Sequence, residues 1–276
     1  MLGATLAPSN QFPIATGDRL CRRSYAMAIT AFMAACLVAD ARELTVAVAA
    51  NFSGTLQGLA PAFKKKSGHG LTIISGSTGK LYAQIRNGAP FDVYMAADTE
   101  RPRRIEAAGL GVKGTRTTYA IGQLVLWSTR IDYTDDGADY LRRPDLRRLA
   151  IANPKTAPYG RAAVQVLSRL ELLRPLRARF VQGENVAQAF HFIVSGNADA
   201  GFISRSLLAV SRQERSGSFW LVPGHLYDPI EQQAILLARV RDSAAARGFL
   251  AFITSDAARA RIREYGYQVP PASLPK

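Results

Sequence analysis

Short apolar runs alternate with helical patterns along most of the chain. Residues 44–50 (LTVAVAA) form an almost uninterrupted apolar run, and shorter runs occupy 71–74, 91–96, 123–128, 149–152, 199–203, 219–222 and 233–238. Such runs are typical of strands buried on both faces of a sheet. Apolar residues recur at helical spacing over 56–66, 78–87, 99–108, 161–173, 186–194, 243–254 and 255–264. The alternation predicts an α/β protein with largely parallel sheets.

The alternation of strands and helices occurs twice along the chain, which predicts two α/β lobes. Ligands commonly bind in the cleft between two such lobes. The chain is 48% apolar and 20% charged, an ordinary composition for a globular protein, so a disordered chain is excluded. We find no internal repeat and no segment of low complexity.

The first 41 residues resemble an export signal. Arg22 and Arg23 precede an uncharged, mostly apolar stretch over residues 26–39, which is too short to cross a bilayer. Ala39-Asp40-Ala41 matches a small-x-small cleavage pattern, so the mature chain is expected to begin at Arg42. We favour ordinary secretion to the periplasm over a twin-arginine signal, and a cleavable signal over a lipoprotein anchored at Cys36.

Both cysteines, Cys21 and Cys36, lie inside this segment. The mature protein would therefore contain no thiol nucleophile, no thiolate metal site and no disulfide. The three histidines, His69, His191 and His225, are too far apart for metal-ligand spacing, and no G-x-S-x-G nucleophile motif occurs. No metal ligands, cofactor or catalytic group are expected.

Four places in the chain share one layout, in which a small or polar residue follows an apolar strand and precedes a helix. They are Ala50-Asn51-Phe52-Ser53, Ser75-Gly76-Ser77-Thr78-Gly79, Pro158-Tyr159-Gly160 and Glu184-Asn185-Val186. Each one alone is best interpreted as helix capping. Together, several helix N-termini that converge on one point make an anion site from N–H groups alone. The segment at Ser77 is not a nucleotide-binding P-loop, because Ile74 replaces the first glycine and Leu81 the final Ser or Thr.

The chain is basic, with a formal net charge of +14. This charge is compatible with nucleic acid, an anionic membrane surface or the steering of a small anion. The basic residues are dispersed and are not interleaved with aromatic residues, so no nucleic-acid partner is expected.

Several of these segments, taken together, resemble the periplasmic molybdate-binding protein family, ModA. The most specific stretch is residues 75–98 (SGSTGKLYAQIRNGAPFDVYMAAD), supported by 46–52 (VAVAANF), 119–126 (YAIGQLVL), 151–159 (IANPKTAPY) and 184–186 (ENV). The resemblance implies a type II periplasmic-binding-protein fold, in which two α/β lobes close over one tetrahedral oxyanion. It places lobe I at residues 42–122 plus 230–276, lobe II at 123–229, and hinges near 120–123 and 224–232.

The resemblance also implies the ligand-binding positions. They match Asn51, Ser77, Thr78, Tyr159 and Val186, with Ala50 and Ser204 as additional positions. Ser204 stands where some members have a tyrosine, which leaves the number of hydrogen bonds open. The implied function is capture of molybdate or tungstate by a monomer, for delivery to the permease and ATPase of an ABC importer. A receptor for sulfate or phosphate and an exported hydrolase using Ser77 or Tyr159 are the alternatives.

Overall fold

The computed structural model describes residues 43–130, 137–212, 217–240 and 243–270. The signal peptide predicted at residues 1–41 lies outside the described residues. The described residues all belong to one compact unit. Within them, no helix is long and apolar enough to cross a membrane.

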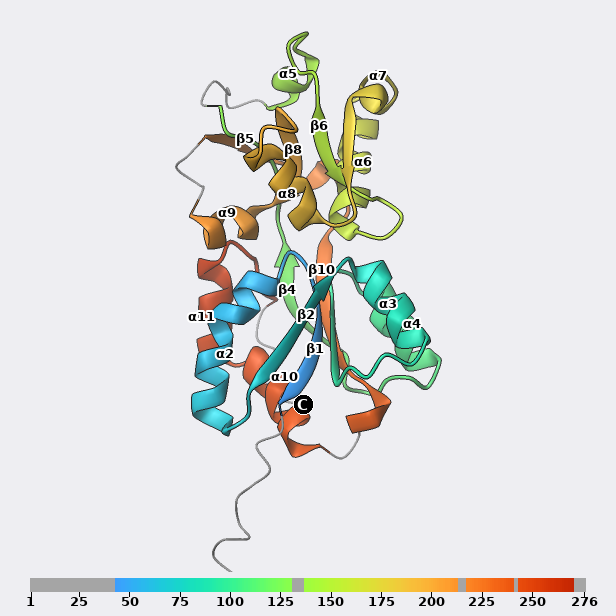
Figure 1. Ribbon diagram of the computed structural model, residues 1–276, viewed down its shortest axis with the longest axis vertical. Helices are drawn as coiled ribbons and strands as arrows, with labels where there is room; N and C mark the ends of the chain where they lie inside the picture. The colour runs from blue at the N-terminus through green and yellow to red at the C-terminus, as the bar shows by residue number, and fades with distance from the viewer. Residues whose placement is uncertain (1–42, 131–136, 213–216, 241–242, 271–276) are drawn as a thin grey trace, which may run out of the picture. The chain divides into compact units, whose positions relative to one another are not determined.

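The described strands form two five-stranded sheets (Figure 1). The first sheet has the order β2-β1-β3-β10-β4. Its strands are β1 (Leu44–Ala49), β2 (Leu71–Gly76), β3 (Val93–Ala96), β4 (Thr117–Gly122) and β10 (Ile230–Leu236). The second sheet has the order β7-β6-β8-β5-β9. Its strands are β5 (Leu124–Ser128), β6 (Leu149–Ala152), β7 (Phe180–Gly183), β8 (Ala200–Ser204) and β9 (Ser218–Leu221).

The sheets are mixed, so the expectation of largely parallel sheets is wrong. β1 pairs in parallel with β2 and β3, and β6 pairs in parallel with β7 and β8. The other described pairings are antiparallel: β10 with β3 and β4, and β5 with β8 and β9. The reason is connectivity. β10 enters the first sheet after the chain has crossed back from the second, so it runs opposite to its neighbours.

The first sheet is covered on both faces because its strands are apolar on both sides. Val46 and Val48 of β1 point into one core cluster, and Ala47 between them points into another, as the alternation of a strand requires. The first cluster includes residues of α2 (Ser53–Ser67), α10 (Ala244–Ile253) and α11 (Asp256–Glu264). The second includes residues of α3 (Thr78–Arg86) and α4 (Glu100–Ala107). Figure 1 shows α3 and α4 on the opposite side of this sheet from α2 and α11.

The second sheet packs with its helices into one large core cluster. The longer helices are α6 (Pro158–Arg169) and α8 (Val186–Val194). Shorter elements are α5 (Gly137–Arg142), α7 (Leu173–Leu176), α9 (Arg205–Ser211) and the 3-10 turns 177–179 and 224–226. A further 3-10 turn, 238–240, follows β10 and belongs to the first sheet, whose core includes Val240. The helix expected at 161–173 begins earlier, at Pro158, and ends at Arg169. It ends there because Glu171 takes a left-handed backbone conformation (φ 61°) and the Leu172 N–H bonds back to the Leu167 carbonyl.

The chain passes between the two sheets at two places, from β4 to β5 and from β9 to β10. We call the first sheet with its helices the first lobe, and the second sheet with its helices the second lobe. The first sheet draws its strands from residues 44–122 and 230–236, and the second from 124–221. That the two crossings act as hinges stays a prediction.

Candidate functional site

Each lobe places two strand-to-helix junctions at the boundary between the lobes. In the first lobe, Asn51 follows β1 and Ser77 is the N-cap of α3. In the second lobe, Tyr159 lies in the first turn of α6 and Val186 opens α8. These are the four places singled out from the sequence.

The four junctions line one small cavity. Its lining comprises Ala49, Ala50, Asn51, Gly76, Ser77, Thr78, Ala97, Ala157, Pro158, Tyr159, Asn185 and Val186. The structure therefore brings together Ala50, Asn51, Ser77, Thr78, Tyr159 and Val186, which lie far apart in sequence. Ser204, the other residue expected there, does not line this cavity.

The cavity is small, with a volume of about 10 Å³. This is close to the smallest space that holds one water molecule. A tetrahedral oxyanion is larger than water, so the walls must move apart before such a ligand enters. Because the walls come from both lobes, separation of the lobes is the simplest movement that achieves this.

Backbone N–H groups are the main donors around the cavity. Thr78, Tyr159 and Val186 lie in the first turns of three helices, where N–H groups have no acceptor within the helix. Two helices also carry side-chain caps: the Ser77 hydroxyl accepts from the Lys80 N–H (3.4 Å) and Asn185 Oδ1 accepts from the Gln188 N–H (3.0 Å). Capping and ligand binding are compatible at Ser77, because a hydroxyl that accepts still has its own proton to donate.

None of the lining residues carries a formal charge. The positive potential comes from the helix N-termini, each equivalent to roughly half a positive charge. The nearest ion pair in sequence to these junctions joins Lys80 of the first lobe to Glu184 of the second, at 3.1 Å. Both side chains are about half exposed, so this pair contributes little to stability.

The Asn51 side chain is directed into the protein. Its amide nitrogen donates to Gln232 Oε1 (2.9 Å) and to the Tyr267 hydroxyl (3.0 Å). These two bonds use both amide protons. The Asn51 N–H, by contrast, has no backbone acceptor in the described part of the chain. The Asn51 side-chain amide, which the sequence suggested as a donor, is therefore engaged within the protein, and the Asn51 backbone N–H is left available.

Tyr159 is fully buried, and its hydroxyl accepts a hydrogen bond from Gln232 Nε2 (3.3 Å). Burial is the largest cause that raises the pKa of its phenol well above the usual value, and the neighbouring phenols of Tyr267, Tyr227 and Tyr119 raise it further. The phenol therefore stays protonated at neutral pH and keeps an O–H proton to donate.

Three residues of this network were missed from the sequence: Gln232, Tyr119 and Tyr267. Gln232 Oε1 accepts from Asn51 and from the Tyr119 hydroxyl (3.1 Å), and the Tyr267 hydroxyl donates to the Asn51 carbonyl (2.7 Å). Gln232 is a polar residue that β10 buries completely. The strand predicted from the sequence begins at 233, one residue later, so it did not include Gln232.

Ser204 lies behind Asn51. Its hydroxyl accepts from Ser206 (3.0 Å), and the Ser206 hydroxyl also lies within bonding distance of the Asn51 carbonyl (3.1 Å). Ser204 is therefore one residue removed from the cavity lining. Within the described residues, no group of three or more His, Cys, Asp or Glu side chains is arranged to hold a metal ion.

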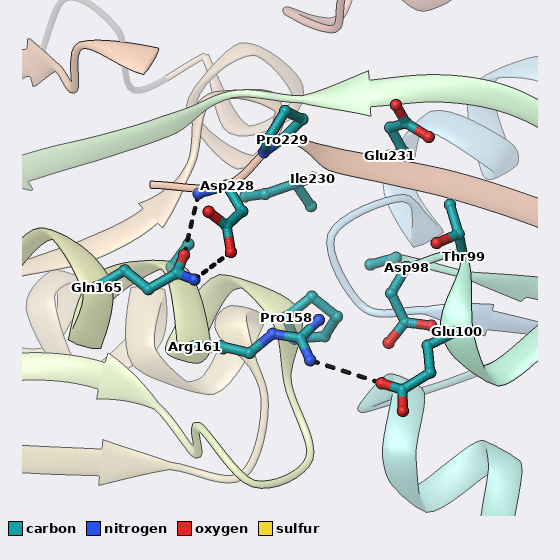
Figure 2. A pocket seen from close by; sticks show the side chains of 12 residues that line it. Asp98, Thr99, Glu100, Pro158, Arg161, Gln165, Asp228, Pro229, Ile230 and Glu231 are labelled. Carbon is teal, nitrogen blue, oxygen red and sulfur yellow. Dashed lines mark hydrogen bonds and ion pairs between the residues drawn. The ribbon is translucent and has the colours of Figure 1, made fainter. Parts of the chain in front are cut away.

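A larger cavity of about 390 Å³ adjoins the first and shares Ala97 and Pro158 with it. Figure 2 shows its side chains: Asp98, Glu100, Asp228 and Glu231 bring four carboxylates, and Arg161 brings one guanidinium, which pairs with Glu100 at 3.7 Å. An excess of carboxylates repels anions. The smaller, uncharged cavity is therefore the candidate anion site despite its size.

Comparisons with known proteins show the family and the fold to which the chain belongs. The family model for bacterial extracellular solute-binding proteins matches residues 44–268. The molybdate-binding protein ModA of Azotobacter vinelandii is 44% identical over 241 residues, which cover 87% of this chain and 95% of that protein. ModA of Rhodobacter capsulatus is 40% identical, over 89% of this chain and 96% of that protein.

A solved structure of the periplasmic molybdate-binding protein of Azotobacter vinelandii superposes with a TM-score of 0.79 at 41% identity. The match covers 83% of this chain and all of that one. The type II fold expected from the sequence, two α/β lobes with a ligand site between them, is thus confirmed. The chain belongs to the bacterial extracellular solute-binding proteins and, among them, to the ModA family.

Proposed function

We propose that this protein captures molybdate, and also tungstate, in the periplasm and delivers it to the permease and ATPase of an ABC importer. The observation that carries the proposal is the cavity between the lobes, where four strand-to-helix junctions meet and no lining residue is charged. The relatives with 44% and 40% identity are molybdate-binding proteins, which supports this choice of ligand. The oxyanion would be held by Asn51, Ser77, Thr78, Tyr159 and Val186, with Ala50 beside them.

A site built only from donors suits a fully deprotonated oxyanion. Molybdate and tungstate offer four acceptor oxygens and no proton at neutral pH. A protonated oxyanion such as hydrogen phosphate needs an acceptor for its proton, and the cavity has no carboxylate to provide one. Sulfate has the same charge and shape as molybdate, so its exclusion depends on size.

The absence of a counter-ion fits a carrier that must release its ligand. Charge is balanced by helix ends, which belong to both lobes and move apart when the lobes open. The first lobe supplies Asn51, Ser77 and Thr78, and the second supplies Tyr159 and Val186. Separation of the lobes therefore divides the donor set and weakens binding.

The same cavity argues against hydrolysis. Activation of Ser77 or Tyr159 as a nucleophile needs a neighbouring base. No His, Asp or Glu lines the cavity, and burial raises the pKa of Tyr159, which disfavours the phenolate. We therefore propose a binding protein without catalytic activity.

Isothermal titration calorimetry with molybdate, tungstate, sulfate and phosphate tests the proposal. We expect saturable, tight binding of the first two anions and none of the others. Calorimetry is preferable to fluorescence, because neither tryptophan lines the cavity: Trp127 is buried against Phe190 in the second lobe, and Trp220 lies on β9. Tight binding of sulfate or phosphate alone would keep the fold and change the ligand. No response to any of the four would refute the proposal.

A further inference from the structure

Gln232 connects ligand-binding residues of the two lobes through a single side chain. Its Oε1 accepts from the Asn51 amide (2.9 Å), in the first lobe, and its Nε2 donates to the Tyr159 hydroxyl (3.3 Å), in the second. Gln232 lies on β10, the strand that follows the second crossing between the sheets. We propose that Gln232 is a positioning residue. It holds Asn51 and Tyr159 at fixed positions relative to each other across the closed site and so sets the affinity of the site for the oxyanion.

The backbone of β10 is adapted at this position. Gln232 pairs with Ala120 of β4, whereas Gln233 pairs with Thr118, so the register shifts between the two glutamines and Tyr119 has no partner of its own. Such bulges re-aim side chains. Here the Tyr119 hydroxyl, fully buried, lies within bonding distance of both Gln232 Oε1 (3.1 Å) and the Ala96 carbonyl (3.2 Å). The bulge therefore brings a further donor beside the Gln232 amide.

The surrounding packing leaves the Gln232 amide and the Tyr159 hydroxyl little freedom to move. Gly122, the last residue of β4, lies directly against them: a Cβ there would come within 2.1 Å of the Tyr159 hydroxyl and 2.8 Å of Gln232 Nε2. A side chain at position 122 would push both groups away. The close approach explains why glycine occupies this position.

A primary amide meets the needs of this position. It accepts at one end and donates at the other, whereas a carboxylate only accepts and an aliphatic side chain does neither. It is also neutral. A carboxylate here would place a negative charge next to the Asn51 side chain, close to the proposed oxyanion site.

The inference rests on the proposed function, and its test begins with molybdate titration of the wild-type protein. The first variant is Gln232→Met, which keeps the length of the side chain and removes both hydrogen-bonding ends. Its matched control is Gln233→Met on the same strand, whose side chain bonds Thr118 and Arg116 outside the site. We expect Gln232→Met to weaken molybdate binding by about tenfold or more and Gln233→Met by less than about twofold.

A double-mutant cycle separates positioning from general stability. Tyr159→Phe removes the hydroxyl through which Gln232 reaches the second lobe. If Gln232 acts through that hydroxyl, Gln232→Met weakens binding less in the Tyr159→Phe background than in the wild type. A purely structural role would lower the thermal midpoint and give equal effects on affinity in both backgrounds, which would overturn the inference.

Gln232→Glu keeps the inference testable if the methionine variant does not fold. It preserves the length and the acceptor for Asn51 and Tyr119, but loses the donor and adds charge, so we expect binding to weaken by at least about tenfold. Wild-type affinity in this variant would overturn the inference while leaving the proposed function intact. A wild-type protein that binds no oxyanion would overturn both.

Discussion

The N–H of Gly79 donates a hydrogen bond to the carbonyl of Thr156, at 2.8 Å. The bond joins the first turn of α3, in the first lobe, to the loop before α6, in the second. Arg101 of the first lobe adds a side-chain bond to the neighbouring Lys155 carbonyl (3.2 Å). The lobes therefore meet through backbone groups beside the cavity, and they approach each other closely at Gly79.

A methyl group at position 79 should hinder that closure. In Gly79→Ala the new Cβ would lie 3.0 Å from Thr156 Cα and 3.1 Å from its carbonyl oxygen, closer than ordinary contact. We expect molybdate affinity to fall about three- to tenfold by calorimetry, because the closed state is strained. Gly248→Ala is the control, since a Cβ at this position of α10 would meet nothing within 4 Å outside the adjacent helix backbone. Unchanged affinity in Gly79→Ala would show that the ligand-bound lobes do not make this contact.

The residues that line the cavity should matter more than the one behind it. Tyr159→Ala and Asn51→Ala should each weaken molybdate binding by about tenfold or more, because each loses bonds that hold the site together. Ser204→Ala should change affinity by less than about threefold, because the Ser204 hydroxyl bonds Ser206, outside the lining. Calorimetry measures the affinities, and circular dichroism checks that all three variants fold. The reverse order of effects would contradict the site as assigned.

Molybdate affinity should depend little on pH between about 6.5 and 9. The lining holds no carboxylate, histidine, lysine or cysteine, and its one phenol, Tyr159, has a raised pKa. No group in the lining therefore changes charge across this range. Titrations in buffers with different ionisation enthalpies should also give the same binding enthalpy. A marked loss of affinity within this range would indicate a titrating group in the site.

Stability, in contrast to affinity, should fall in alkali. Burial raises the pKa of Tyr94, Tyr119, Tyr159 and Tyr267 above that of an unfolded tyrosine. A group whose pKa is raised by folding contributes stability that is complete below the unfolded pKa, about 10, and is lost as pH rises above it. Each such tyrosine should lower the free energy of unfolding by roughly 1.4 kcal/mol per pH unit above that value. Urea unfolding between pH 9 and 11 measures this, and Tyr119→Phe should reduce the slope.

Local patterns identified most of the helices and the buried strands. The helix expected at 186–194 coincides with α8, and the one expected at 78–87 is α3 to within a residue. The apolar run at 44–50 is β1. These segments could be predicted because a central strand must be apolar on both faces and a capping residue stands next to its helix. In each case the pattern lies within a few neighbouring residues.

Strands β4 and β7 and the short helices α5, α7 and α9 were not predicted from the sequence. β4 and β7 are edge strands of the two sheets, and their partly exposed residues do not form an apolar run. α5 and α9 are only six and seven residues long, too short for a helical period to stand out. The antiparallel direction of β10 could not be predicted from the sequence either, because strand direction depends on where the chain re-enters the sheet.

For the site, the sequence by itself determined which strand-to-helix junctions carry donors, since capping and strand burial are local properties. The tertiary structure alone decided that the Asn51 amide faces inward, that Gln232 bridges Asn51 to Tyr159, and that Ser204 lies behind the lining. The bonds concerned join residues separated by 181 and 73 positions. Such pairings are set by the packing of both lobes around β10, and no local pattern of side chains encodes which buried donor will meet which acceptor.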